Sequence, residues 1–182
     1  MPLEFTTSYL KDATDVFRYY KQLGERAMAQ TPDAELFATL DAQSNSIAII
    51  VKHVSGNLRS RWTDFLTTDG EKPGRNRDSE FEMATDTRAE LMAQWEAGWK
   101  CLFDTLTQLS DADLSTRVVI RTEAHSVTQA INRALAHTVY HVGQIVYLSK
   151  HFSGANWQAL TIPRGKSAEF FADVAAGKKS QR

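Results

Sequence analysis

Apolar residues recur at the three- and four-residue spacing of an amphipathic helix in four long segments of the chain. Two of these segments open on a Ser or Thr that is followed three residues later by Glu or Gln, which is the spacing of a capping box. The pairs are Thr87 with Glu90 and Ser126 with Gln129. The pattern predicts helices over about residues 3–29, 45–66, 87–109 and 126–152, and a short helix over 167–175.

The connection between the second and third helices is the longest. Residues 67–86, TTDGEKPGRNRDSEFEMATD, are rich in charge and contain Pro and Gly, and they are longer than a turn between neighbouring helices needs. Such a length favours a crossover that leaves helices 2 and 3 parallel. We predict an all-α four-helix bundle, with a short strand or hairpin in RVVIRTEA before helix 4. Residues 1–182 are expected to form one domain, frayed over about 176–182.

Composition excludes several classes of protein. The 182 residues are 42% hydrophobic and 24% charged, as in an ordinary globular domain. A net charge of -1 gives no electrostatic argument for binding nucleic acid or a membrane surface. The N-terminus has no signal-peptide pattern, and no stretch is apolar and long enough to span a bilayer. With the single Cys101, which excludes an intrachain disulfide, we expect a cytoplasmic protein.

Two histidines interrupt the apolar pattern of the last long helix. His137 and His141 are four residues apart in ALAHTVYHVGQIVYL, so their side chains lie on the same face of the helix. A neutral imidazole offers a metal ion one nitrogen lone pair, and this spacing directs two of them to one point. The alternative is a pair of core histidines that are hydrogen-bonded to their neighbours.

A third histidine favours the metal interpretation. His53 lies in AIIVKHVSGNL, in the middle of helix 2 and on its apolar side. Three imidazoles and a water form an open coordination shell of the kind found in catalytic zinc sites. The residues therefore predict one divalent ion bound by His53, His137 and His141. Zn or Ni is expected, although three imidazoles also suit Co, Cu or Fe.

Polar residues continue along helix 2 beyond His53. Asn57, Arg61 and Asp64 follow at or near helical spacing and are candidates to line a substrate pocket, with Arg61 binding a carboxylate and Asp64 acting as a base or orienting a group. A solvated helix end is the alternative. Gln144, one turn from His141, is a candidate hydrogen-bond partner for a metal ligand. The charges of the 67–86 crossover order the loop, cap the pocket or are simply solvated.

Helix 4 is apolar on a second side as well, away from the histidines. Such a helix is buried on several sides, either centrally in the bundle or in a homodimer. Leu135, Val139, Val142 and Val146 are the residues concerned.

The segments KHVSGN and AHTVYHVGQIVYLSK resemble the DinB superfamily, and LRSRWTDFLTTDGEKPGRNRDSEF with TIPRGKSAEF resembles one uncharacterised bacterial subfamily of it. The resemblance covers about residues 5–175. It implies an up-down-down-up four-helix bundle in which His53, His137 and His141 bind one divalent metal. Relatives include bacillithiol S-transferases and mycothiol-dependent maleylpyruvate isomerase, which makes a low-molecular-weight thiol a candidate cosubstrate.

Two classes of function follow from these observations. The first is a metal-dependent enzyme, a transferase or a hydrolase, that acts on a small molecule through water or thiol activated at the ion. The second is a non-catalytic bundle that binds a metal or a ligand. A cavity beside an open site favours the first class, and a fourth protein ligand with no cavity favours the second.

Overall fold

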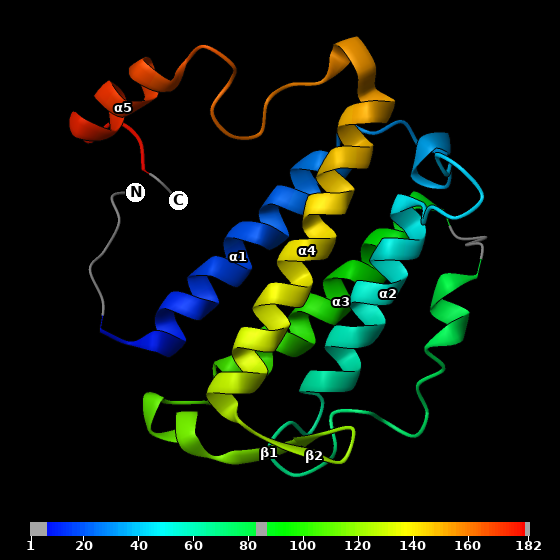
Figure 1. Ribbon diagram of the computed structural model, residues 1–182, viewed down its shortest axis with the longest axis vertical. Helices are drawn as coiled ribbons and strands as arrows, with labels where there is room; N and C mark the ends of the chain where they lie inside the picture. The colour runs from blue at the N-terminus through cyan, green and yellow to red at the C-terminus, as the bar shows by residue number, and fades with distance from the viewer. Residues whose placement is uncertain (1–6, 83–86, 181–182) are drawn as a thin grey trace.

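The computed structural model describes residues 7–82 and 87–180, and this part of the chain is mostly helical (Figure 1). Its α-helices are α1 (Tyr9–Met28), α2 (Ile47–Trp62), α3 (Arg88–Leu106), α4 (Val127–Ser153) and α5 (Ser167–Ala175). A two-stranded antiparallel hairpin pairs β1 (Arg117–Ile120) with β2 (Glu123–Ser126). The all-α class, the short hairpin and the short helix near the C-terminus are as predicted.

The four long helices lie side by side around one core (Figure 1). α2 packs mainly on α3 and α1 mainly on α4, while the contact between α2 and α4 is less extensive. Phe17, Trp95 and Trp99 are fully buried and meet at T-shaped angles, which favours their ring quadrupoles. α2 and α3 approach most closely at Gly98, where an added Cβ would lie 2.8 Å from Cα of Ser55.

The helix N-termini follow from local capping. Both predicted capping boxes are present, at Thr87 and Ser126. The prediction for α1 was wrong at its start, because the Ser8 side chain accepts a hydrogen bond from the Lys11 N–H and the helix begins at Tyr9. Residues 3–6 of that prediction lie outside the described residues.

α2 ends earlier than the apolar pattern predicts. The helix stops at Trp62, Thr63 is extended, and Asp64 has a φ of 47°. A short polar side chain tolerates this left-handed conformation, which turns the chain away from the helix axis. The prediction that α2 continues to residue 66 was therefore wrong, and the Asp64 side chain does not share the face of His53.

The crossover is bound to the rest of the molecule by its charges. The Glu71 carboxylate accepts hydrogen bonds from Arg61 of α2, Arg75 of the crossover and Arg121 of the hairpin turn, and we call these four residues the Glu71 hub. Arg121 and the next residue have positive φ values of 54° and 68°, as in a two-residue turn that matches the strand twist. The crossover charges were expected to order the loop, to cap the pocket or to be solvated. The contacts of the Glu71 hub agree with the first of these interpretations for the hub residues.

The second apolar side of α4 packs within the chain. Val142 is fully buried, and Leu135 and Val146 pack against the core. The exposed apolar side chains of this helix are instead Tyr140 and Tyr147. Val139 and Val146 are only partly buried, so a self-association surface that includes them stays a prediction, as does dimerisation itself.

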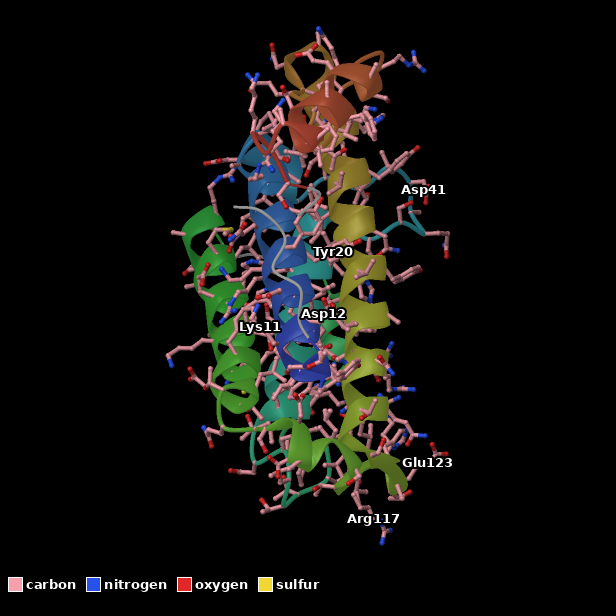
Figure 2. The ribbon with its side chains drawn as sticks, turned by 90° about the vertical axis from the view of Figure 1, so that its left-hand side faces the viewer. Lys11, Asp12, Tyr20, Asp41, Arg117 and Glu123 are labelled. Carbon is pink, nitrogen blue, oxygen red and sulfur yellow. The ribbon has the colours of Figure 1, made fainter. Side chains whose placement is uncertain are left out.

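The C-terminal helix and the hairpin lie at opposite ends of the molecule (Figure 2). In the view turned by 90°, α5 lies at the end opposite the hairpin residues Arg117 and Glu123 (Figure 2). Residues 176–180 of the predicted frayed end form turns, and 181–182 lie outside the described residues. No helix in the described part of the chain has the length and apolar character that crossing a membrane requires.

Candidate metal centre

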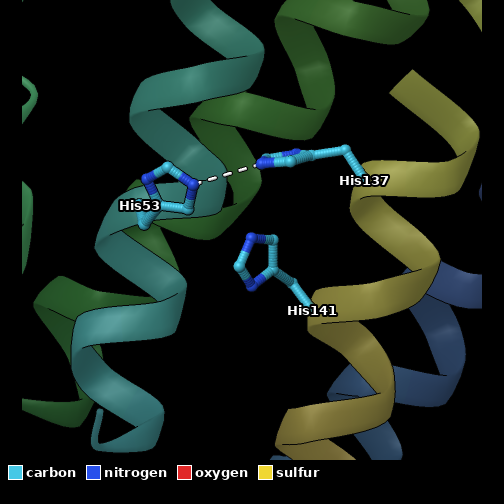
Figure 3. A group of neighbouring side chains, drawn as sticks. All are labelled: His53, His137 and His141. Carbon is cyan, nitrogen blue, oxygen red and sulfur yellow. Dashed lines mark hydrogen bonds between the residues drawn. The ribbon is translucent and has the colours of Figure 1, made fainter. Parts of the chain in front are cut away.

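Three imidazoles from two helices converge between α2 and α4. His53 projects from the middle of α2, and His137 and His141 project toward it from successive turns of α4 (Figure 3). Each offers a ring nitrogen, and these three atoms lie within 4.8 Å of one another. Helical spacing therefore places the pair on α4, and packing of α2 against α4 brings in the third ring.

The partner of His53 is a carboxylate from the crossover. Nδ1 of His53 lies 2.9 Å from Oε2 of Glu80, in the short helix Asp78–Phe81. Burial alone would raise the pKa of Glu80, but hydrogen bonds from His53 and Arg75 outweigh it and lower this pKa. An ionised carboxylate only accepts hydrogen bonds, so Nδ1 of His53 donates and its Nε2 lone pair is directed at the other histidines.

His141 is oriented in the same way by its own helix. Its Nδ1 lies 2.8 Å from Oε1 of Gln144, one turn along α4, so this N–H donates and Nε2 remains a potential ligand. No hydrogen bond from a described residue reaches that Nε2. The predicted role of Gln144 agrees with this contact and remains a prediction until a metal is bound.

The geometry fits a divalent ion. Nε2 of His53 and Nε2 of His137 are 3.1 Å apart, close to the roughly 3.3 Å that separates two tetrahedral ligands at about 2.0–2.1 Å from zinc. Two facing lone pairs repel unless a proton or a cation lies between them. Nδ1 of His137 is buried and has no partner among the described residues, so nothing in the described chain assigns its tautomer. The three-histidine cluster could thus hold a metal ion.

Glu80 is itself held tightly in place. Arg75 forms a two-point contact with it, through Nε to Oε1 at 2.8 Å and through Nη2 to Oε2 at 2.9 Å. Gly56 of α2 gives the carboxylate room, since a Cβ there would collide with Oε1 of Glu80. A chain of contacts therefore runs from the Glu71 hub through Arg75 and Glu80 to His53.

A cavity of about 360 Å³ opens beside the histidines. His53 and His137 form part of its wall, together with Asn57 and Arg61, which places these two predicted pocket residues next to the cluster. Asp64 is not part of this wall and lines a separate hollow with Thr67 and Gln108, because the left-handed turn removes it from the helix face.

Arg61 is less available than the sequence suggests. Its guanidinium donates to the Gly70 carbonyl and to Glu71, and burial is the main cause that lowers its pKa below the usual value. Two of its donors therefore order the crossover rather than face a ligand. The predicted carboxylate-binding role has no direct support from these contacts.

The structure brings in three residues that the sequence did not single out for the site. They are Glu80, Gly56 and Arg133. The single cysteine and the other two histidines lie elsewhere: Cys101 packs against the core from α3, His125 is on β2, and His151 is exposed near the end of α4. Tyr140 meets His141 edge-on at a centroid distance of 4.9 Å, and its side chain is exposed.

These features define a helical protein with a partly buried, carboxylate-supported three-histidine cluster beside a cavity. The chain belongs to the family described as "Protein of unknown function (DUF1572)", whose profile matches residues 4–166. No match is found among the curated proteins. A conserved protein from Enterococcus faecalis has a similar fold in its crystal structure, with 15% identity over 81% of this chain and 98% of that chain and a TM-score of 0.61.

Protonation of the partly buried His137 should destabilise the metal-free protein. Burial, and then the neighbouring His141 and His53, lower the pKa of His137 to about 3, whereas an unfolded histidine titrates near pH 6.5. Between these values the unfolded chain binds a proton that the folded chain does not. The free energy of unfolding should therefore decrease as the pH falls from about 6.5 toward 3, by less than about 1.4 kcal/mol per pH unit.

Urea unfolding of chelator-treated protein at pH 7.5 and pH 5.5 measures this effect. His137→Asn should show a smaller loss than the wild type, and His151→Asn, which changes an exposed histidine, should behave like the wild type. Equal losses in all three proteins would contradict the assignment to His137.

Proposed function

We propose that this protein is a divalent-metal-dependent enzyme, a transferase or a hydrolase, that acts on a small molecule. The observation that carries the proposal is the convergence of three imidazoles on one point at the wall of a cavity. The cluster contains three such ligands within the described residues, which suits an open site rather than one closed by a fourth side chain. Zn and Ni are the ions we propose first.

The fold proposed for this function is the up-down-down-up four-helix bundle of the DinB superfamily. Its support is the packing of α1 on α4 and α2 on α3, with the crossover passing outside the helices between α2 and α3 (Figure 1). In such a bundle, ligands from facing helices project into the space between them. The three histidines occupy such positions on α2 and α4.

The residues of the chain have distinct tasks in this proposal. An ion bound here would lower the pKa of a water or thiol at its open position, or polarise an oxygen of the substrate. In this proposal His53, His137 and His141 bind the ion. Glu80 holds the ring of His53, and Gln144 holds the ring of His141, each with Nε2 directed inward. Trp62 and Phe65 give the cavity an apolar wall, which excludes water from the reacting groups. Asn57 is placed to orient a polar group of the substrate.

A thiol cosubstrate would have to come from outside the chain. Cys101, the single cysteine, packs from α3 against the core, where its Sγ lies 3.4 Å from the Thr63 hydroxyl. It is not part of the cavity wall. A low-molecular-weight thiol that enters the cavity is therefore the thiol-dependent form of the proposal, and water as nucleophile is the hydrolytic form.

Cobalt substitution tests whether the site is open. The tag-free, chelator-treated protein is loaded with Co(II), and its visible absorption spectrum is recorded before and after addition of 2-mercaptoethanol or azide. We expect both additives to change the spectrum, because each can enter the fourth position of a three-histidine site. A spectrum that neither additive changes would favour a closed, non-catalytic metal-binding bundle. Failure to bind Co(II) at all would remove the metal proposal.

A further inference from the structure

The cavity beside the three histidines carries an excess of positive charge. Its wall includes Arg61, Arg77, Arg121 and Arg133, and no Asp or Glu side chain belongs to the wall among the described residues. The protein as a whole has a net charge of -1, so this concentration of arginine is local. Several arginine side chains around one concave site are typical of proteins that recognise carboxylate or phosphate groups.

The four arginines differ in how many donors they have left. Arg61 and Arg121 both pair with the Glu71 carboxylate, so one negative charge serves these two positive ones, because Arg75 pairs mainly with Glu80. The guanidinium of Arg133 makes no hydrogen bond or ion pair with any described residue. Arg77 lies over the Phe81 ring at 4.8 Å and approaches only the exposed Asp78, at 3.9 Å.

Arg77 and Arg133, which have the fewest partners of the four arginines, come from two different elements of the cavity wall. Arg133 is on α4, one turn before His137, and Arg77 is on the crossover just before the helix that carries Glu80. Both side chains are at least partly exposed, which places their charges toward solvent, whereas His53 is buried. The same wall has an apolar part formed by Trp62, Phe65 and Ile120.

We propose that the cavity binds a small molecule with an anionic group, which pairs with Arg77 and Arg133 at the mouth while an apolar body packs on Trp62, Phe65 and Ile120. The reactive end then lies at His53 and His137. This inference rests on the proposed function and adds to it the chemical class of the substrate. Anion recognition itself depends on the arginines alone and not on a bound metal.

A pair of probes that differ only in charge tests the assignment. 3-Phenylpropionate and 3-phenylpropionamide have nearly the same size and the same apolar body, but only the first is an anion. Calorimetric titration of each into the full-length protein, once after chelator treatment and once with added Zn, measures the preference. We expect the carboxylate to bind on the order of tenfold more tightly than the amide in the metal-free protein, and less so at high salt.

Two double variants with the same change in net charge separate recognition from bulk electrostatics. Arg77→Gln/Arg133→Gln should lose the preference for the carboxylate. Arg26→Gln/Arg164→Gln, which changes exposed arginines outside the cavity wall, should keep it. Loss of affinity for the carboxylate alone, with the amide unaffected, distinguishes lost charge recognition from a collapsed cavity.

Three results would overturn the proposal: no binding of the carboxylate, equal binding of the two probes, or equal losses in the two double variants. Failure of the metal proposal is visible separately. In that case the probes bind the chelator-treated protein as expected, while added Zn neither binds nor changes their affinities.

Discussion

Replacing His137 and His141 together with alanine is expected to abolish metal binding. Protein purified without a histidine tag should contain close to one equivalent of a divalent metal, and the double variant almost none. Two of the three ligands come from these residues, and a four-ligand zinc site is worth about 10–16 kcal/mol. Loss of two of the three protein ligands should weaken binding by at least about a thousand-fold. Elemental analysis of both proteins, with and without added Zn or Ni, measures the difference.

The chain supplies a matched control in its two other histidines. His125→Ala/His151→Ala removes the same number of imidazoles at positions outside the cluster and should retain the metal. Added metal should also raise the Tm of the wild type and of this control by mass action, but not that of the His137/His141 variant. Equal metal contents in all three proteins, or none in any of them, would return the histidines to the role of hydrogen-bonded core residues.

Replacing Glu80 with alanine should weaken metal binding about 10- to 100-fold while all three ligands remain. The carboxylate holds His53 with Nε2 directed at the other two rings, and without it the ring is free to change orientation and tautomer. Loss of Glu80 also leaves Arg75, which is almost fully buried, with only its long contact to Glu71. The free energy of unfolding should therefore fall by about 3 kcal/mol.

Metal titration and urea unfolding give the two effects independently. Gly56→Ala should weaken metal binding in the same direction, because its new methyl group displaces the Glu80 carboxylate without changing any charge. Glu82→Ala removes an exposed carboxylate two residues away and serves as the control, with metal affinity and stability close to those of the wild type. If Glu80→Ala binds metal as tightly as Glu82→Ala, the carboxylate has no part in positioning His53.

Local information in the sequence was sufficient for the helices and for the three histidines. Capping boxes at Thr87 and Ser126 placed the starts of α3 and α4, since both partners of each box lie within one turn. The spacing of His137 and His141 put them on one helix face, and the apolar surroundings of His53 put it on the inner face of α2. In each case the geometry of a single helix connects the sequence to the position of the side chain.

The wrong helix boundaries have local causes, whereas the residues missed at the site are brought in by long-range contacts. The apolar pattern of α2 continues past Trp62, although the left-handed Asp64 ends the helix. Glu80 is 27 residues from His53 and lies among many charges in a loop without periodicity, so no local signal distinguishes it. Arg133 resembled any exposed helical arginine, because the cavity that it borders exists only after α4 meets the crossover and the hairpin.

The Glu71 hub is expected to affect the rate at which an ion or a small molecule enters and leaves the site. α2, the crossover and the hairpin turn meet at this one carboxylate, so detachment of the crossover withdraws Glu80 from His53 and uncovers the cavity in the same movement. Opening of a surface loop is much faster than separation of two packed helices. Release of an ion and passage of a small molecule would then occur at the same rate. This rate should depend on the salt concentration, because ion pairs hold the crossover in place.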